Sequence, residues 1–261
     1  MTGDDDAGLD MVANAATRFA ALSTLFDANT RCHLLKRGLA TGWQCLEVGG
    51  GNGSIASWMA EHVGPAGRVV VTDIETRFLD VLDRPNLEVR RHDIRRDPMP
   101  GQRFDLVHAR MILTHLPERD AALRRLVTAV KPGGYLVCEE FDGVSTEADA
   151  RVSPGEVSLK THRAMHRLSV DRGLDRRYGR LLFGRLRELG LADVGAEARM
   201  SMIQSGSSMA RLLRASYELR RRAMIDAGYV TDEEFDADLA RMEADDFMMP
   251  SPVMWTAWGR R

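Results

Sequence analysis

Short apolar runs alternate with amphipathic segments through the first half of the chain. Each run is about four to seven residues long, which is typical of a buried strand. Between the runs, apolar residues recur at the spacing of a helix that buries one face. Strands that alternate with such helices predict a parallel sheet covered on both faces. The expected strands are residues 45–48, 69–72, 87–91, 104–108 and 135–141, and the expected helices are 55–63, 75–82 and 123–130.

The remaining segments predict additions to this alternating core. We expect residues 1–8 to be a disordered acidic tail and residues 9–261 to form a single domain. Residues 9–41 predict N-terminal helices with a break near residues 27–30, and the polar segments 145–177 and 205–247 predict helical insertions that form a lid over the active site. The second insertion predicts two helices, and its Thr231–Glu234 segment matches a capping box. A helix is expected at 178–189, and strands at 194–202 and 253–258.

Glycines at every second position follow the first expected strand. The segment runs from Glu47 through Gly49, Gly51 and Gly53 before a helical pattern begins. Residues without a Cβ permit both a sharp turn and the close approach of a ligand to the backbone. Glycines between a strand and a helix therefore predict a site for a nucleotide-sized cofactor at the sheet edge.

Two carboxylates distinguish between the cofactors that such a turn can hold. Residues 51–56 also satisfy the dinucleotide fingerprint, but Glu47 would repel a pyrophosphate and attract a cation. Asp73 ends the second expected strand, where it can bind the two ribose hydroxyls. A cationic ligand without phosphates fits both acids, and S-adenosylmethionine (SAM) is such a ligand.

Five motifs in order resemble those of class I SAM-dependent methyltransferases, in particular the large group that acts on small molecules. The resemblance covers somewhat over a third of the chain and implies a Rossmann-like, seven-stranded, mostly parallel doubly wound sheet whose last strand runs antiparallel beside the fifth. Glu47 stands where aspartate is more common in this family. The matching segments are residues 47–53, 72–74, 92–94, 104–117 and 131–136.

The resemblance implies roles around the nucleoside of SAM for four residues. Asp73 would hold the ribose hydroxyls, and Ile74 would pack on the adenine. Asp93 would accept a hydrogen bond from the adenine amino group, and Ile94 would donate its backbone N–H.

Other residues are expected around the methionine part of SAM. Glu47 would orient the amino group, directly or through water, and Ala109 and Arg110 would line the methionine end. Arg110 could instead bind an acidic group of the substrate. The residues expected to bring their backbone close to the methionine and ribose are Gly49, Gly51, Asn52 and Gly53.

One histidine is a candidate general base. His115 follows the fourth expected strand, near the reactive end of the cofactor, and histidine can accept a proton near neutral pH. A structural role for His115 is the alternative. His162 and His166 are four residues apart, but no third ligand accompanies them, so we expect no metal.

Composition limits the remaining possibilities. The 261 residues carry a formal net charge of −2, which does not favour binding to nucleic acid or to an anionic membrane. No apolar run reaches the roughly 20 residues that span a bilayer. The acidic N-terminus lacks the basic start of a signal peptide, so a cytoplasmic protein with reduced cysteines is expected.

The predicted function is transfer of a methyl group from SAM to an oxygen or nitrogen of a small, fairly apolar metabolite, with S-adenosylhomocysteine (SAH) as product. The 14 methionines fit either a helix core or an adaptable apolar pocket. Alternatives are methylation of a macromolecule such as tRNA or protein, SAM binding without methylation, and a nicotinamide-dependent dehydrogenase. The sequence does not predict the oligomeric state.

Overall fold

A computed structural model describes residues 3–101, 103–143 and 159–261, with side chains from residue 16 onward. The chain divides into two compact units, which we call the sheet unit and the helical unit. The sheet unit comprises Asp27–Asp142, Asp175–Arg199 and Val253–Arg261, and the helical unit comprises Met1–Phe26, Gly143–Leu174 and Met200–Pro252.

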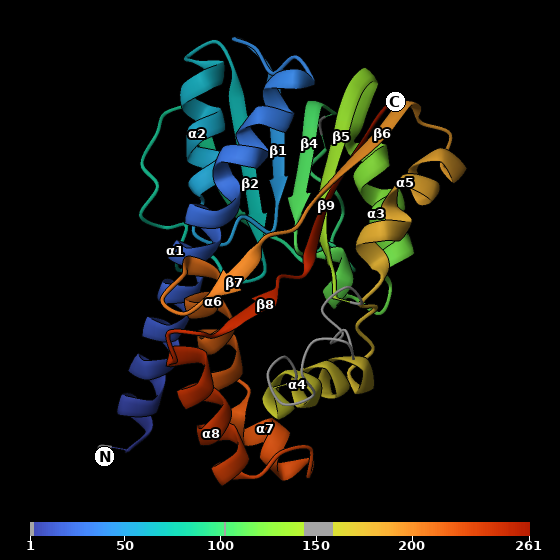
Figure 1. Cartoon of the computed structure of the whole chain (residues 1–261). Helices are drawn as coiled ribbons and strands as arrows, with labels where there is room; N and C mark the ends of the chain where they lie inside the picture. Colours follow the sequence, from blue (N-terminus) through green and yellow to red (C-terminus); the bar gives the residue numbers. More distant parts are fainter. Residues whose placement is uncertain (1–2, 102, 144–158) are drawn as a thin grey trace. The chain divides into compact units, whose positions relative to one another are not determined.

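Seven described strands form one sheet in the sheet unit, in the order β3-β2-β1-β4-β5-β9-β6 (Figure 1). The strands from β3 to β5 are parallel to their neighbours, whereas β9 is antiparallel to both β5 and β6. The expected Rossmann-like, mostly parallel sheet is therefore confirmed, including the place of the last strand. The strands are β1 (Gln44–Val48), β2 (Arg68–Asp73), β3 (Leu87–Arg91), β4 (Phe104–Arg110), β5 (Val130–Asp142), β6 (Ala192–Arg199) and β9 (Val253–Arg260).

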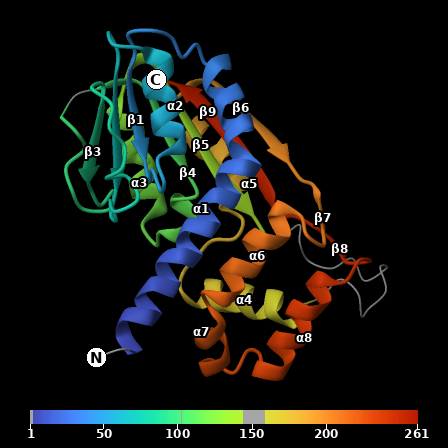
Figure 2. The ribbon, with the colours of Figure 1, turned by 90° about the vertical axis from the view of Figure 1, so that its left-hand side faces the viewer.

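Helices cover both faces of this sheet (Figure 2). On one face, α2 (Ser54–Val63) and the last residues of α1 (Gly3–Lys36) bury an apolar cluster with β1 and β2. On the other face, α3 (Arg119–Ala129) and α5 (Tyr178–Glu188) bury a second cluster with β4 and β5. Because both faces are covered, the central strands bury apolar side chains on both sides, as the sequence pattern indicated, although Glu47, His108 and Glu139 interrupt the apolar runs.

The prediction of a helix at residues 75–82 is wrong. This segment forms only a single turn, in which the carbonyl of Thr76 accepts hydrogen bonds from the N–H groups of Leu79 and Asp80. Leu79 is fully buried and anchors the segment against α2 and β2. The Arg84–Pro85 pair then restricts the chain to an extended conformation, which leaves no room for a longer helix.

The break expected near residues 27–30 does not occur, because α1 is continuous from Gly3 to Lys36. Asp27 and Thr30 are polar residues within this helix, and both are buried. Their side chains contact residues of β4 and β5, so these polar positions belong to a helix face that packs on the sheet. Residues 3–8, where disorder was expected, are the first residues of α1.

The helical unit contains four described helices besides the start of α1, and a small two-stranded sheet. The segment 205–247 forms three helices where two were expected, because the chain turns at Leu219 and Arg220 between α6 and α7. The capping box is confirmed, since the Thr231 and Glu234 side chains each accept from the backbone N–H of the other residue. The elements are α4 (Lys160–Asp171), α6 (Ser208–Glu218), α7 (Arg221–Asp226), α8 (Asp232–Glu243), β7 (Met202–Gln204) and β8 (Met248–Pro250).

The helical unit also contains the histidines that the sequence pattern singled out. His162 is buried, and its Nδ1 lies 2.6 Å from the hydroxyl of Tyr217. His166 stacks edge-on against it, with ring centroids 3.9 Å apart. Most of the segment 145–177 that precedes α5 lies within the described residues, but residues 145–158 lie outside them.

Cys45 and Cys138 lie in β1 and β5, and both are buried free thiols, as expected. Cys32 is exposed. Among the described residues, none of the helices combines the length and the hydrophobicity needed to cross a bilayer.

Candidate cofactor site

A pocket of about 320 Å³ lies at the carboxyl ends of β1, β2 and β3. This edge of a parallel sheet is where nucleotide cofactors bind in open α/β folds. Six of its lining residues were expected in the site: Gly49, Asp73, Ile74, Asp93, Ile94 and His115. The other lining residues are Val48, His92, Arg95, Met111, Ile112 and Leu116.

The glycine turn has the backbone geometry that the sequence indicated. Gly49, Gly51 and Gly53 all have positive φ angles, of 74°, 57° and 74°. A Cβ on Gly49 would lie only 1.9 Å from Cδ1 of Ile112, so a side chain at this position would displace Ile112 from the pocket wall. The turn is therefore shaped by a conformational requirement and by a close approach at the pocket wall.

Asp73 and Ile74 lie together at the end of β2. The Asp73 carboxylate accepts hydrogen bonds from the backbone N–H of Gly51 at 3.0 Å and from that of Glu75 at 3.1 Å. Ile74 is 59% exposed, although it is a large apolar residue. An acid beside an exposed apolar side chain can bind the hydroxyls of a ribose and cover one face of a flat base.

Asp93 and Ile94 follow β3 on the same side of the pocket. Arg95 donates to the Asp93 carboxylate from its backbone N–H and from Nε, both at 2.9 Å, and from Nη2 at 2.7 Å. These hydrogen bonds and the arginine charge lower the pKa of Asp93 to about 2. The sequence did not predict this pairing, which gives Arg95 a place in the pocket wall.

Two buried polar groups near the turn keep unused hydrogen-bonding capacity within the described part of the chain. His92 lines the pocket and is only 8% exposed, yet neither ring nitrogen has a hydrogen-bond partner there. Oε2 of Glu47 is likewise buried without a hydrogen bond. Buried polar atoms are normally paired, so both groups are suited to a polar ligand.

The structure places the other expected residues outside the pocket lining. Ala109 is fully buried in the apolar cluster under α3, so its side chain faces the core. Arg110 donates to Asp27 Oδ1 at 2.9 Å and to Thr30 Oγ1 at 3.0 Å, both on α1. The expected residues that do not line the pocket are Glu47, Gly51, Asn52, Gly53, Ala109 and Arg110.

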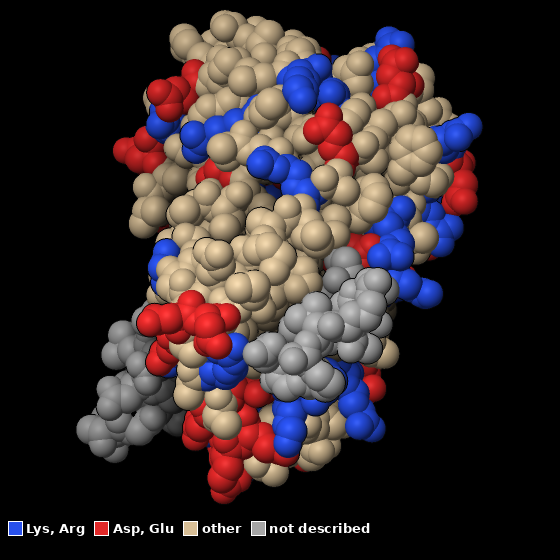
Figure 3. All heavy atoms as spheres, in the orientation of Figure 1, with Lys and Arg blue, Asp and Glu red and all other residues tan. Residues whose placement is uncertain are grey.

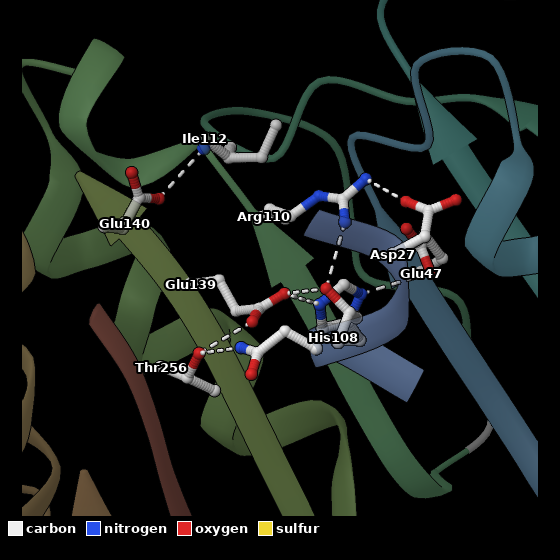
Figure 4. Close-up of polar contacts among 10 residues, drawn as sticks. Asp27, Glu47, His108, Arg110, Ile112, Glu139, Glu140 and Thr256 are labelled. Atoms are coloured by element: carbon white, nitrogen blue, oxygen red, sulfur yellow. Dashed lines mark hydrogen bonds and ion pairs between the residues drawn. The ribbon is translucent and has the colours of Figure 1, made fainter. Parts of the chain in front are cut away.

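A buried ionic group lies beneath the turn, and the sequence analysis missed most of it (Figure 4). His108 on β4 is fully buried between two carboxylates, with Nδ1 3.2 Å from Glu47 Oε2 and Nε2 3.3 Å from Glu139 Oε2. Glu139 also accepts from Thr256 at 2.7 Å and from Thr30. A histidine and a glutamate within otherwise apolar strand runs were the only sequence signal for this group.

A second buried carboxylate holds the loop after β4. Glu140 Oε1 accepts from the backbone N–H groups of Ile112 and Leu113 at 2.9 Å and 2.6 Å, and Oε2 accepts from that of Thr114 at 3.3 Å. These donors begin the short 3₁₀ helix η1 (Leu113–His115), which carries His115 to the pocket. Glu140 thereby fixes one wall of the pocket from the protein interior (Figure 4).

Comparison with known proteins agrees with this geometry. Residues 46–138 match the model of a methyltransferase domain family. Among curated proteins, the chain is similar to the ubiquinone/menaquinone biosynthesis C-methyltransferase UbiE of Pseudomonas putida, with 36% identity over 112 residues. The match covers 40% of this chain and 44% of that protein, so the chain spans less than half the length of the curated relatives it matches.

Two solved structures share the fold. Phosphoethanolamine N-methyltransferase 2 of Haemonchus contortus, in complex with SAH, has a TM-score of 0.55 and 18% identity, over 89% of this chain and 53% of that one. The [4+2]-cyclase SpnF has a TM-score of 0.50 and 19% identity, over 90% of this chain and 81% of that one. The chain thus resembles SAM-dependent methyltransferases in residues 46–138 and shares their fold.

Proposed function

We propose that this protein transfers a methyl group from SAM to a small, fairly apolar metabolite and releases SAH. The observation that carries the proposal is the pocket at the sheet edge, which brings together Gly49 of the glycine turn, Asp73, Ile74 and Asp93. These residues come from three separate strand ends, and a methyltransferase domain model matches the same part of the chain.

The residues around the pocket have the chemistry to hold SAM. Asp73 is proposed to bind the ribose hydroxyls, and the exposed Ile74 to cover the adenine. Ile94 is proposed to donate its backbone N–H to the adenine. Asp93 is proposed as the acceptor for the adenine amino group, with Arg95 holding the carboxylate in place. His92 adds unpaired ring nitrogens to the same wall.

The methionine part of the cofactor is proposed to lie over the glycine turn, where the missing Cβ atoms permit close approach. Glu47 is proposed to accept a hydrogen bond from the amino group through its unpaired Oε2. Arg110 is engaged with α1, so we propose that it positions this helix and does not contact the ligand directly. The backbones of Gly49, Gly51 and Gly53, together with Asn52 and Ala109, complete the proposed set.

Bound SAM supplies a methyl group already activated by the positive sulfonium. The protein then has to orient the acceptor, and alignment at contact distance can contribute roughly 7–11 kcal/mol to lowering the barrier. His115 lines the pocket and is proposed as the base for an acceptor that must lose a proton. No metal is assigned a role in this proposal.

The proposed acceptor is a small, fairly apolar molecule. The curated relative is named for C-methylation in quinone biosynthesis, which favours an apolar acceptor and adds carbon to oxygen and nitrogen as a possible methylated atom. In the helical unit, Met209, Met224, Met242 and Met249 are buried in the core, as a simple packing role requires. Met200, Met202 and Met248 are each more than half exposed. We propose that the helical insertions form the acceptor side of the protein.

Methylation of a macromolecule is the less favoured alternative. Positive and negative side chains are interspersed on the face shown in Figure 3, where a nucleic-acid site would call for a basic patch. The formal net charge of −2 agrees with a small-molecule acceptor and with the absence of a nucleic-acid partner. A cytoplasmic location remains a prediction.

SAM binding without methyl transfer has one specific point in its favour. The fold is shared with SpnF, whose name describes it as a [4+2]-cyclase. A fold fixes where a cofactor binds and does not fix the reaction. Release of SAH during incubation with SAM and a panel of quinols, phenols and amines would distinguish methyl transfer from binding alone.

The cofactor site is tested by calorimetric titration of SAH and SAM into the wild type and into Asp73→Ala. We expect the variant to weaken binding by about 1.5–3 kcal/mol, the scale of a hydrogen bond to a charged group. Asp83→Ala is the matched control, because Asp83 is exposed in the same loop and does not line the pocket. A change of less than about threefold in Asp73→Ala would show that Asp73 does not bind the ribose.

A parallel thermal-shift measurement with NADH tests the dinucleotide alternative. A ligand at about 100 times its dissociation constant stabilises a protein by about 2.7 kcal/mol. We expect that shift with SAH and SAM and none with NADH. A shift with NADH alone would overturn the proposed cofactor.

A further inference from the structure

The buried group of Glu47, His108 and Glu139 lies beside the proposed cofactor site and has no part in the chemistry described above. His108 is 0% exposed, Glu139 1% and Glu47 4%. The three residues lie on adjacent strands β4, β5 and β1, and they meet on the sheet face that packs against α1 (Figure 4).

The contacts define the protonation state of His108. Each of its two ring nitrogens faces a carboxylate oxygen, at 3.2 Å and 3.3 Å. Nε2 hydrogen-bonds Glu139, whereas Nδ1 lies within ion-pair distance of Glu47 without forming a hydrogen bond, so a carboxylate on each side of the ring favours the imidazolium. Burial alone would lower the pKa of His108, but the two carboxylates outweigh it and raise the pKa to about 9. At neutral pH the His108 ring is therefore cationic and Glu139 is anionic.

Glu47 and Glu139 use their contact with His108 differently. Glu139 is saturated, because it also accepts from Thr30 and from Thr256. Glu47 lies within ion-pair distance, yet its Oε2 makes no hydrogen bond within the described residues. The imidazolium therefore provides Glu47 with a compensating charge and leaves an acceptor available for a ligand.

The group also extends to α1. Thr30 donates to Glu139 and accepts from Arg110 at 3.0 Å, and Arg110 pairs with Asp27 at 2.9 Å. A continuous line of polar contacts thus runs from the glycine-turn acid, through the sheet, to one turn of the helix (Figure 4). All of these residues belong to the sheet unit.

Stability alone does not account for such a group. Buried ion pairs cost much desolvation energy, and well-packed apolar residues of similar volume often stabilise a fold as much or more. The surrounding positions of β4 and β5 carry such residues, since Leu106, Val107, Leu136 and Val137 are all fully buried. The presence of a histidine and two carboxylates among these residues therefore indicates a functional role at the neighbouring cofactor site.

We propose that His108 is a positioning residue that balances the charge of the buried Glu47 carboxylate and keeps it oriented toward the amino group of the cofactor. The inference rests on the proposed function, because it assigns the ligand of Glu47 to the methionine end of SAM. His108 acts through Glu47 and is not expected to contact the cofactor.

Several other charged groups face this cluster and contribute to its titration. Arg110 on β4 lowers the pKa of Glu139 together with His108, whereas burial raises it, and the net result is about 2. His33 on α1 is buried, and desolvation lowers its pKa despite the nearby Glu139. Asp27 on α1 pairs with Arg110 and with Arg31 of its own helix. Glu197, Lys36 and Arg37 act on His33, and Glu140 lies on the other face of β5 with a pKa of about 7.

The test is the pH dependence of SAH binding in His108→Gln, measured by calorimetry between about pH 6 and pH 8. The wild-type profile is the reference, because His108 and Glu139 titrate outside this range, whereas Glu140, which holds the pocket wall at η1, has a pKa of about 7. Without the imidazolium, the two buried carboxylates have no cation between them and take up a proton as the pH falls. We therefore expect the variant to bind SAH about tenfold more weakly near pH 6 than near pH 8.

A second substitution distinguishes positioning from a purely structural role. In the double variant His108→Gln with Glu139→Gln, one carboxylate is removed, so two carboxylates no longer face each other without a cation and the wild-type pH profile of SAH binding should return. His62→Gln is the matched control, since His62 is an exposed histidine of α2, and it should leave both the affinity and its pH profile unchanged. A His108→Gln variant that loses thermal stability but binds SAH independently of pH would overturn the inference.

NMR of isotope-labelled histidine in the wild type gives a result that does not depend on any variant folding. Both ring nitrogens of His108 should be protonated near pH 7.5, and a neutral ring would overturn the inference. Wild-type protein that fails to bind SAH would overturn the proposed function as well, whereas SAH binding with a neutral His108 would overturn only the role of His108.

Discussion

Glu139 and Glu140 are adjacent on β5 and both are fully buried, yet their pKa values shift in opposite directions because they face opposite sides of the sheet. Glu139 lies on the face toward α1, among His108, Thr30 and Thr256. Glu140 points to the other face, where it accepts hydrogen bonds from backbone N–H groups of the loop that begins η1 (Figure 4). A charged partner therefore compensates for the burial of the Glu139 carboxylate, whereas backbone dipoles compensate for the burial of Glu140.

The pKa values follow from this difference. Burial raises the pKa of both carboxyls, but the His108 and Arg110 charges reverse the effect at Glu139 and lower its pKa to about 2. At Glu140 the hydrogen bonds offset burial only in part, and the pKa rises to about 7. Full charges within contact distance outweigh desolvation here, whereas three backbone dipoles do not.

The largest loss of stability is expected from substituting Glu139, which pairs with the charged His108 ring. Glu139→Gln leaves the His108 imidazolium with one carboxylate and weakens the contacts with Thr30 and Thr256. Breaking a buried pair on one side costs about 3–5 kcal/mol in the free energy of unfolding, which urea denaturation measures. Glu197→Gln is the control, because Glu197 is 50% exposed and should cost less than about 1 kcal/mol. Equal costs for both variants would contradict the comparison.

The role of Glu140 is tested by the pH dependence of the free energy of unfolding. The pKa of Glu140 is higher in the folded protein than its ordinary value of 4.5, so its contribution to stability is complete below about pH 4.5 and is lost as the pH rises through 7. We expect Glu140 to reduce wild-type stability by about 3 kcal/mol between those limits. Glu139 has the opposite sign, and its contribution is lost only as the pH falls from 4.5 through about 2.

Glu140→Gln isolates this effect, since glutamine does not titrate. Denaturation curves at about pH 5 and pH 8 should show the wild type losing about 3 kcal/mol more than the variant between the two conditions. The same pH change in both proteins would mean that Glu140 stays ionised in the fold.

A smaller effect is expected from removing one hydrogen bond to Glu139. Thr256→Val keeps the shape of the side chain but removes the hydroxyl that donates to Glu139 at 2.7 Å. We expect a loss of about 1.5–3 kcal/mol in unfolding free energy, the scale of a hydrogen bond to a charged group. Thr128→Val removes an exposed hydroxyl that bonds a helix carbonyl, and it should cost clearly less. A neutral Thr256→Val would show that Glu139 depends on the cations alone.

The smallest effect is expected at the edge of the same sheet. Arg260 and Asp193 form an ion pair of 2.6 Å between β9 and β6, but both side chains are about half exposed. Asp193→Asn should cost about 0.2–1 kcal/mol, because water screens the pair and asparagine tolerates the positive φ of 49° at this position. A loss above about 2 kcal/mol would show that an exposed ion pair can contribute as much stability as the buried pair of Glu139 and His108.

Much of the sheet unit could be predicted from the sequence. Strand runs such as Val69–Val71 are apolar at every position because both faces of a parallel sheet are covered, and that pattern is local. The glycine turn was equally readable, since positive φ at Gly49 and Gly53 is a property of those positions themselves. Asp73 and Asp93 followed from their places after strands, and the pocket contains both.

The sequence misled where polar residues serve long-range contacts. Asp27 and Thr30 indicated a helix break, but they form part of a continuous helix because partners on β4 and β5 satisfy them. Arg110 was expected at the ligand and instead binds α1. Neither partner is near in sequence, so no periodicity could reveal it.

The sequence by itself determined the alternating strands and helices, the turn for the cofactor and the acids at the strand ends, because each depends on local backbone preference or on side-chain period. Only the tertiary structure decided which buried carboxyl is charged. Glu139 and Glu140 are the same residue type one position apart, and nothing local distinguishes them. Strand pleating turns them to opposite faces, and the groups packed on each face set their charge.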